Sequence, residues 1–183
     1  MASNFRKGLM ASEDVRSLLV TGAYVSGGAR AICPDGAVVV IGDLVNSSVY
    51  TSVLDLNVHS IAAPAAITDS VAIVDYDGIS QGTIQGVVYR DGVKTYGLAV
   101  PADRTTRVRR LIKGDTGWFG SSNFASTPTV GQYAIPTASA TTWTPAASAV
   151  TTSTCIKIES SKPVTEGAVN TDTEYFCTFV NVL

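Results

Sequence analysis

The sequence predicts an all-β protein, a small β-barrel or sandwich with an extended N-terminal arm and one short helix. From Ala23 onward, runs of Val, Ile, Tyr and Thr are broken by turn residues every eight to twelve residues or so, which is typical of sandwiches and barrels. Apolar and polar residues alternate within several runs, as in a strand with one buried face. Helical periodicity is absent from this middle part, so alternating helices and strands are not expected.

The composition indicates one domain that buries apolar surface against neighbours. Charged residues make up 15% and hydrophobic residues 45% of the 183 residues, whereas about 25% of a typical domain is charged. No apolar run approaches the roughly 18 residues of a membrane helix, so we expect no membrane partner and assign the apolar surplus to a subunit interface. The net charge of −2 provides no overall basic field for nucleic acid.

Residues 1–22 are expected to form an arm that includes the helix, followed by a β-domain over residues 23–183. Ser12 is a plausible N-cap for a helix over Ser12–Val20, and the following Thr-Gly pair would end it. The first ten residues include Phe5 and Leu9 but have no periodicity, so we expect a neighbouring subunit to order them. Acidic residues precede any long apolar segment, so no secretory signal is predicted.

Most of the β-domain is expected to form strands joined by short turns. Asp91-Gly92 is the clearest hairpin turn, and the final strand has apolar residues on both faces, as in a central or interfacial strand. The uncharged segment 121–154 is rich in Ser, Thr, Ala and Pro, and we expect extended loops that lie on protein. The expected strands are Ala37–Ile41, Val49–Val58, Val71–Tyr76, Thr83–Arg90, Val93–Val100, Cys155–Glu159 and Glu174–Val182.

The stretch Arg104–Phe124 concentrates the positive charge of the chain. It holds five of the 13 Lys and Arg residues, whereas Thr116–Ile156 contains no charged residue. One explanation is a strand with solvated arginines and aromatic residues in its own core. The other is an interface at which arginines meet acidic or carbonyl groups of a neighbouring subunit. The candidate protein-interface residues are Phe5, Leu9, Arg107, Arg109, Arg110, Trp118, Phe119, Tyr133 and Trp143.

No catalytic, cofactor or metal site is predicted. Gly78–Gly82 matches G-x-S-x-G, but the residues that follow are strand-like, and the only histidine, His59, precedes Ser80 instead of following it. The acidic residues near Asp75 lack the further ligands of a calcium loop. The three cysteines, Cys33, Cys155 and Cys177, are far apart in the sequence and are expected to be small buried hydrophobic residues.

The order of features resembles the small head proteins of tailed bacteriophages, which are decoration or auxiliary capsid proteins. An N-terminal arm is followed by AVVVIGDLV (Ala37–Val45) and VAIVDYDG (Val71–Gly78), and then by RVRRLIKGDTGWFGSSNF (Arg107–Phe124) and VGQYAIP (Val130–Pro136). The Ser/Thr/Ala-rich residues Thr137–Thr154 have no counterpart in this resemblance.

The resemblance implies a structural virion protein, made in the host cytoplasm, that binds and stabilises the outside of a capsid. It implies the major capsid protein as partner, a homo-oligomer that is often a trimer, and no enzymatic activity. The alternative is a carbohydrate- or receptor-binding β-module of a phage head fibre or tail, because β-sandwiches also present Trp and Tyr in shallow sugar sites. The positions of Trp118, Trp143 and Tyr133 should distinguish the two functions.

Overall fold

The computed structural model describes residues 19–45, 58–75, 81–84, 87–90, 99–102, 104–166 and 170–183, and their regular structure is almost entirely β. Among the described residues, the one helical element is a 3₁₀ turn, η2. The elements are β1 (Leu19–Ser26), β2 (Ala29–Arg30), β3 (Cys33–Pro34), β4 (Val38–Leu44), β5 (Val58–Ala62), β6 (Ala72–Asp75), β7 (Gln81–Ile84), β8 (Val87–Arg90), β9 (Ala99–Val100), β10 (Thr106–Arg110), β11 (Thr116–Gly120), η2 (Ser121–Asn123), β12 (Tyr133–Pro136), β13 (Trp143–Ala146), β14 (Cys155–Glu166) and β15 (Asn170–Asn181).

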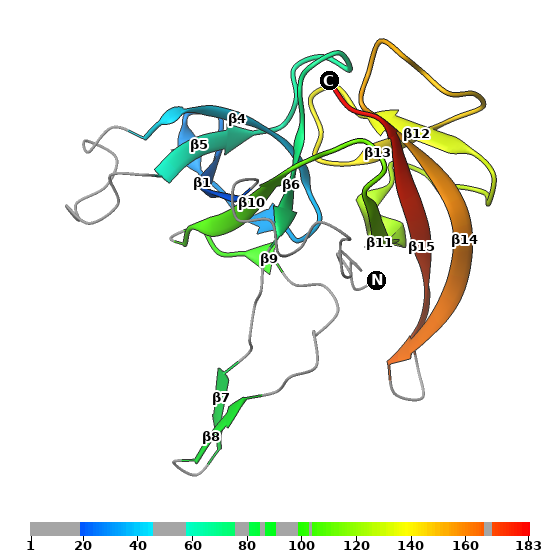
Figure 1. Cartoon of the computed structure of the whole chain (residues 1–183). Helices are drawn as coiled ribbons and strands as arrows, with labels where there is room; N and C mark the ends of the chain where they lie inside the picture. Colours follow the sequence, from blue (N-terminus) through cyan, green and yellow to red (C-terminus); the bar gives the residue numbers. More distant parts are fainter. Residues whose placement is uncertain are drawn as a thin grey trace.

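Five strands close into a barrel. Their order is β10-β6-β4-β5-β1, and β1 also pairs antiparallel with β10, which closes the ring (Figure 1). Strands β1 and β5 are parallel, whereas the other barrel pairs are antiparallel. Closure removes the unpaired edges that an open sheet would expose. The expected all-β fold is therefore confirmed, and of its two forms the chain contains a barrel.

Small and β-branched side chains fill the barrel, as its few strands require. Four side chains of one cluster are fully buried: Val39, Ile61, Val74 and Val108. Gly22 allows the strands to approach closely, because a Cβ atom there would lie 2.8 Å from the Cγ2 atoms of both Ile61 and Val108. The strand alternation thus places one residue set of each strand inside and leaves the other set on the outside of the barrel.

A second, five-stranded antiparallel sheet packs beside the barrel in the order β11-β15-β14-β12-β13. Its two long strands, β14 and β15, form a hairpin that extends beyond the other strands (Figure 1). The rings of Phe119, Trp143 and Phe179 meet edge to face in its core, with centroids 6.1–6.3 Å apart. Val38 and Ile73 of the barrel belong to the same cluster, so the barrel and the second sheet share one core.

The Ser/Thr/Ala-rich segment lies on protein, as expected. It supplies β12 and β13, and its intervening loop bonds to the barrel side of the molecule: the Val38 amide donates to the Thr141 carbonyl at 2.9 Å, and the Ser139 amide donates to the Pro64 carbonyl at 2.7 Å. These bonds give hydrogen-bond partners to backbone N–H and C=O groups that burial would otherwise leave unpaired. The segment is therefore part of the folded domain, and it contributes Phe124, Ala134 and Trp143 to the core.

Several sequence predictions need correction or fall outside the described residues. Thr83–Arg90 was expected as one strand, but Thr83 belongs to β7 and Arg90 to β8, and the two strands pair antiparallel. The Asp91-Gly92 turn, most of Val49–Val58 and most of the Ser12–Val20 helix lie outside the described ranges. Leu19 and Val20, the end of the expected helix, are already in β1, where Leu19 pairs with Arg109 and Val20 with Val108.

Candidate protein-interaction face

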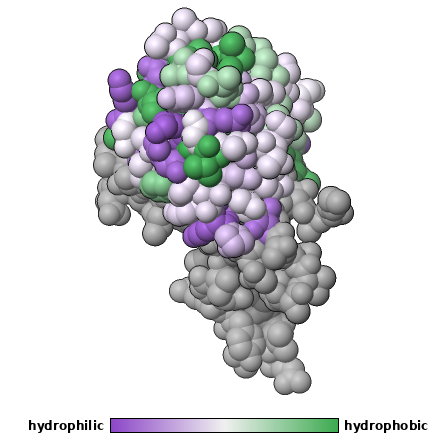
Figure 2. All heavy atoms as spheres, turned by 90° about the vertical axis from the view of Figure 1, so that its right-hand side faces the viewer, coloured by the Kyte–Doolittle hydropathy of each residue, from purple (hydrophilic) through white to green (hydrophobic). Residues whose placement is uncertain are grey.

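The strand alternation of the second sheet leaves one face toward the core and one toward the outside, which we call the outer face. In register across β11, β15, β14 and β12, the row Thr116, Thr178, Lys157 and Tyr133 lies on this face, and all four residues are half-buried. Figure 2 views the molecule from the right-hand side of Figure 1, and the face seen there is mostly pale, with separate polar and apolar groups. The outer face is thus weakly polar and broad.

An aromatic pair forms the most distinctive part of the outer face. Trp118 of β11 and Phe176 of β15 are direct partners in the ladder, with ring centroids 5.2 Å apart and planes tilted by 44°. Both residues are half-buried. Because β11 is the last strand of the sheet on this side, the pair lies at a sheet edge, where a partner could contact rings and backbone together.

A lysine and a buried glutamate flank the aromatic pair. The Lys162 Nζ atom lies 4.1 Å from the centre of the Trp118 ring and 3.2 Å from the Glu174 Oε2 atom. The Glu174 side chain is only 3% exposed, whereas the Lys162 side chain is 51% exposed. The ring and the carboxylate therefore both attract the ammonium group, and the cluster of Trp118, Phe176, Lys162 and Glu174, hereafter the Trp118 cluster, is locally charge-balanced.

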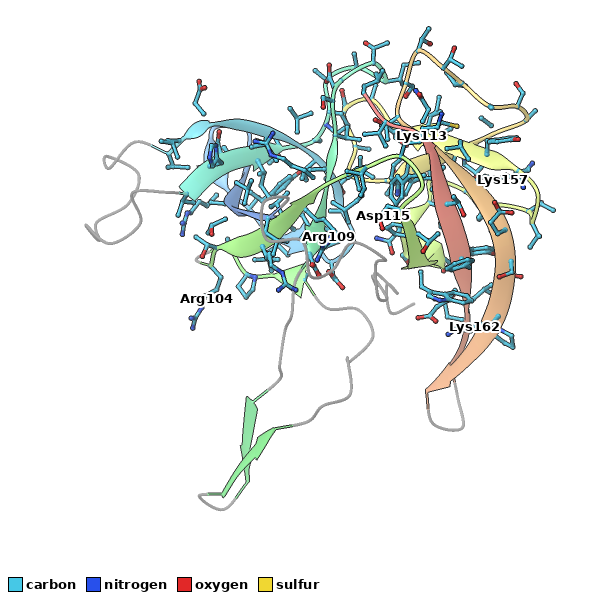
Figure 3. All side chains as sticks on the ribbon, viewed as in Figure 1. Arg104, Arg109, Lys113, Asp115, Lys157 and Lys162 are labelled. Atoms are coloured by element: carbon cyan, nitrogen blue, oxygen red, sulfur yellow. The ribbon has the colours of Figure 1, made fainter. Side chains whose placement is uncertain are left out.

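On strand β14, which also carries Lys162, the residues Lys157 and Glu159 form another ion pair. The Lys157 Nζ atom lies 2.9 Å from the Glu159 Oε2 atom, and the hydrogen bond to Glu159 raises the pKa of Lys157. Lys157 and Lys162 both project from β14 on the right-hand side of the molecule (Figure 3). Since each lysine already has a carboxylate beside it, the outer face carries little net charge. This balance favours a protein partner over a polyanion.

The aromatic residues predicted at an interface divide between the surface and the core. Trp118 and Tyr133 are half-buried on the outer face, but Phe119 and Trp143 have 0% exposure and belong to the shared core. The prediction of an interface role is corrected for Phe119 and Trp143, because neither has surface to offer. In β11 the alternation separates the adjacent Trp118 and Phe119 onto opposite faces of the sheet.

The three predicted interface arginines also have different environments. Arg109 is fully buried and its Nη2 atom lies 2.9 Å from the Asp75 Oδ2 atom, whereas Arg107, at 3.1 Å from the same oxygen, is 35% exposed. Arg109 therefore meets an acidic group of its own chain, and the expected neighbour contact is corrected for this residue. Arg110 is exposed. Phe5 and Leu9, the arm residues among the predicted sites, lie outside the described residues.

Sequence reasoning missed Phe176, Lys162 and Glu174. Phe176 lies in the last strand, where apolar residues were expected on both faces, but nothing in the sequence pairs it with Trp118, which lies in a distant segment. The ladder register creates this contact, because Trp118 meets Phe176 and Gly120 meets Glu174. The periodicity of each strand indicates which residues share a face, but it does not indicate which strand lies beside it.

The cysteines and the histidine make contacts within the described part of the fold. All three thiols are buried, and burial together with the nearby Asp35 carboxylate raises the pKa of Cys33 to about 12. The His59 ring contacts the Gly42 carbonyl at 2.9 Å through Nδ1. Within the described ranges, no group of three or more His, Cys, Asp and Glu side chains could hold a metal ion. Ser80 lies outside the described residues, and the next residues form strand β7.

The described part of the chain therefore defines an all-β protein with a closed barrel, a packed second sheet and an aromatic outer face. No family model matches the chain, and no curated protein or solved structure matches it either. Among the described residues, no helix has the length and apolar character to span a membrane.

Proposed function

We propose that this chain is a structural virion protein that binds the outside of a bacteriophage capsid lattice and stabilises it. The major capsid protein is the proposed partner, and the proposed assembly is a homo-oligomer, with a trimer favoured. The observation that carries the proposal is the Trp118 cluster: an aromatic pair, half-buried at a sheet edge, with its neighbouring charges already paired. The proposed role involves no enzymatic activity.

The chemistry of the outer face fits a protein interface. The cores of such interfaces are enriched in aromatic residues and depleted in unpaired charges, and a few aromatic anchors commonly dominate the binding energy. Trp118 and Phe176 provide anchors of this kind, and the Lys162–Glu174 and Lys157–Glu159 pairs limit the number of charges that a partner would need to neutralise. A low content of charged residues in the whole chain, 15%, is consistent with large contacts to neighbours.

The pairing of β7 and β8 gives further support. Among the described strands, β7 and β8 pair only with each other, and an isolated two-stranded hairpin has marginal stability in water. Contact with a neighbouring subunit would provide the missing stabilisation.

A carbohydrate-binding module is the second candidate, because Trp118 and Tyr133 are both half-buried on the outer face. However, Trp143 is in the core, so the three residues do not form a row. Two strands, β15 and β14, separate Trp118 from Tyr133, which is a spacing of about 14 Å at about 4.8 Å per strand. Lys162 already covers the Trp118 ring. These features favour a protein partner over a sugar.

Co-sedimentation with purified capsids of the phage that encodes the chain tests the proposal. We expect the protein to pellet with mature capsids and Trp118→Ala to weaken this binding by tenfold or more, which is about 1.4 kcal/mol. Ile32→Ala is the matched control, since Ile32 is an apolar residue with 65% exposure outside the second sheet. Binding to a glycan array together with no pelleting would favour the carbohydrate-binding module.

A further inference from the structure

The second sheet has three lengths of strand edge along which no described strand pairs. They are the outer sides of the two end strands, β11 and β13, and the part of β14 that follows Ile158. An unpaired strand edge binds strands of other molecules unless its own sequence blocks them. The residues along these three edges therefore decide whether another chain can extend the sheet.

On β11, side chains of the same chain occupy the amides of the edge. The Asp115 carbonyl accepts a hydrogen bond from β15, so by the alternation of an antiparallel ladder the backbone groups of Thr116, Trp118 and Gly120 face the open side. The Thr116 amide donates to the Asp115 Oδ1 atom at 3.0 Å. The Gly120 amide donates to the Asn123 Oδ1 atom at 3.1 Å. The amides on both sides of Trp118 are therefore already paired within the chain.

On β13, a proline and a neighbouring segment block the edge. The Thr137 amide donates to the Thr142 carbonyl just before this strand, so the backbone groups of Trp143 and Pro145 face the open side. Pro145 has no N–H group to donate. The Trp143 carbonyl accepts from the Ala125 amide at 2.8 Å. A strand added to β13 would lack a donor at Pro145 and an acceptor at Trp143.

On β14, a proline and a shift in register interrupt the edge. By the same alternation, Lys162 and Glu174 form a bonded pair between β14 and β15, and the backbone of the next residue, Pro163, faces the open side. Pro163 also lacks an N–H group. The register shifts between Ile158 and Ser160, and prolines and bulges of this kind protect the strand edges of natural sheets.

We propose that the second sheet is closed to β-strand addition, and that Asp115, Asn123, Pro145 and Pro163 close it. The proposed capsid partner then meets the sheet across the outer face, through side chains such as those of the Trp118 cluster, and not by adding a strand. This choice of binding mode rests on the proposed function. Closure of the edges is a property of the isolated protein and does not require a capsid.

Amide hydrogen exchange of the isolated, full-length protein tests the two caps on β11. We expect the Thr116 and Gly120 amides to exchange at least about tenfold more slowly than the Trp118 amide, because only bonded amides need a local opening to exchange. Asp115 and Asn123 supply the acceptors of these two bonds. Equal protection of all three amides would show that another strand covers the edge, and fast exchange of all three would show that the caps do not hold.

Sedimentation velocity tests the two prolines. The double variant Pro145→Thr/Pro163→Thr restores both N–H groups with a residue suited to strands, and we expect about twice the weight-average mass of the wild type at the same concentration, as two copies pair edge to edge. Pro101→Thr is the matched control, since Pro101 is exposed and lies outside the second sheet, and it should keep the wild-type mass.

A folded double variant with the mass of the wild type would overturn the role of the prolines. If circular dichroism shows that the double variant does not fold, the exchange rates of the wild-type amides decide whether the β11 edge is closed. Both measurements use the isolated protein, so a failure of closure is distinguishable from a failure to bind capsids.

Discussion

The Arg109 guanidinium lies 2.9 Å from the Asp75 carboxylate, and neither side chain is exposed to solvent. Both residues lie on the outside of the barrel wall, beside Ile73, which belongs to the core shared with the second sheet. An intact buried ion pair adds little to the free energy of unfolding, but removal of one partner leaves an uncompensated buried charge, which is strongly destabilising. The pair therefore links strands β6 and β10 at the junction of the barrel and the second sheet.

Arg109→Ala should lower the free energy of unfolding by about 3–5 kcal/mol, since it leaves the Asp75 carboxylate buried with a weakened set of partners. Arg110→Ala, an adjacent substitution of the same type at an exposed site, should change it by less than about 1 kcal/mol. Urea denaturation of both variants measures the difference. Equal midpoints for the two variants would show that the buried pair does not stabilise the fold.

The two tryptophans provide a matched test of core and surface. Trp143→Ala should cost about 3–5 kcal/mol of unfolding free energy, because the Trp143 ring is fully buried against Phe119 and Phe179. Trp118→Ala should cost clearly less, since its ring is half-buried at a sheet edge, but it should impair partner binding. Thermal or urea unfolding checks the stability order, and a larger loss for Trp118→Ala would contradict the assignment of the two rings.

Gly22→Ala should destabilise the barrel by about 1–3 kcal/mol through overpacking. The new Cβ atom would lie 2.8 Å from methyl groups of Ile61 and Val108, both fully buried. At Gly42 a Cβ atom meets the Ser60 Oγ atom at 2.6 Å, and this small hydroxyl can rotate away, so Gly42→Ala should cost less. The double variant Gly22→Ala/Val108→Ala should cost less than the sum of its single changes; full additivity would argue against a clash.

The three cysteines should resist alkylation in the folded protein. Thiolates are the reactive form, and because burial and Asp35 raise the pKa of Cys33 to about 12, its thiolate is scarce at pH 8. Burial also raises the pKa of Cys155 and of Cys177. Mass spectrometry after iodoacetamide treatment should detect no labelling in buffer and three labels in guanidinium chloride. Rapid labelling of Cys177 in buffer would indicate that the shared core opens.

Local patterns predicted the all-β class and several strands. Ala37–Ile41, Val71–Tyr76 and Cys155–Glu159 each overlap an observed strand, because period-2 alternation reflects burial of one face. The same patterns could not predict that β1 pairs with β5 and β10, because the three segments are far apart in the chain. Barrel closure thus depends on long-range register, which no local pattern contains.

The candidate site was predictable only in part. Trp118 was identified as an interface residue, and it does lie on the outer face. Arg109 was also identified, but sequence reasoning treated its charge as a surface property, whereas Asp75 neutralises it inside the fold. A strand residue can be assigned to the inside or the outside only when the elements that cover each face are known.

In the proposed function, the outer face of the second sheet contacts a capsid. Hydroxyl-radical footprinting of the protein, free and bound to mature capsids, tests this claim most directly because it reports the solvent access of individual side chains. We predict that modification of Trp118 and Phe176 falls sharply on binding, because a partner that covers the two rings removes their solvent access, while modification of Ile32 is unchanged. Unchanged modification of Trp118 and Phe176 on bound protein would contradict the account.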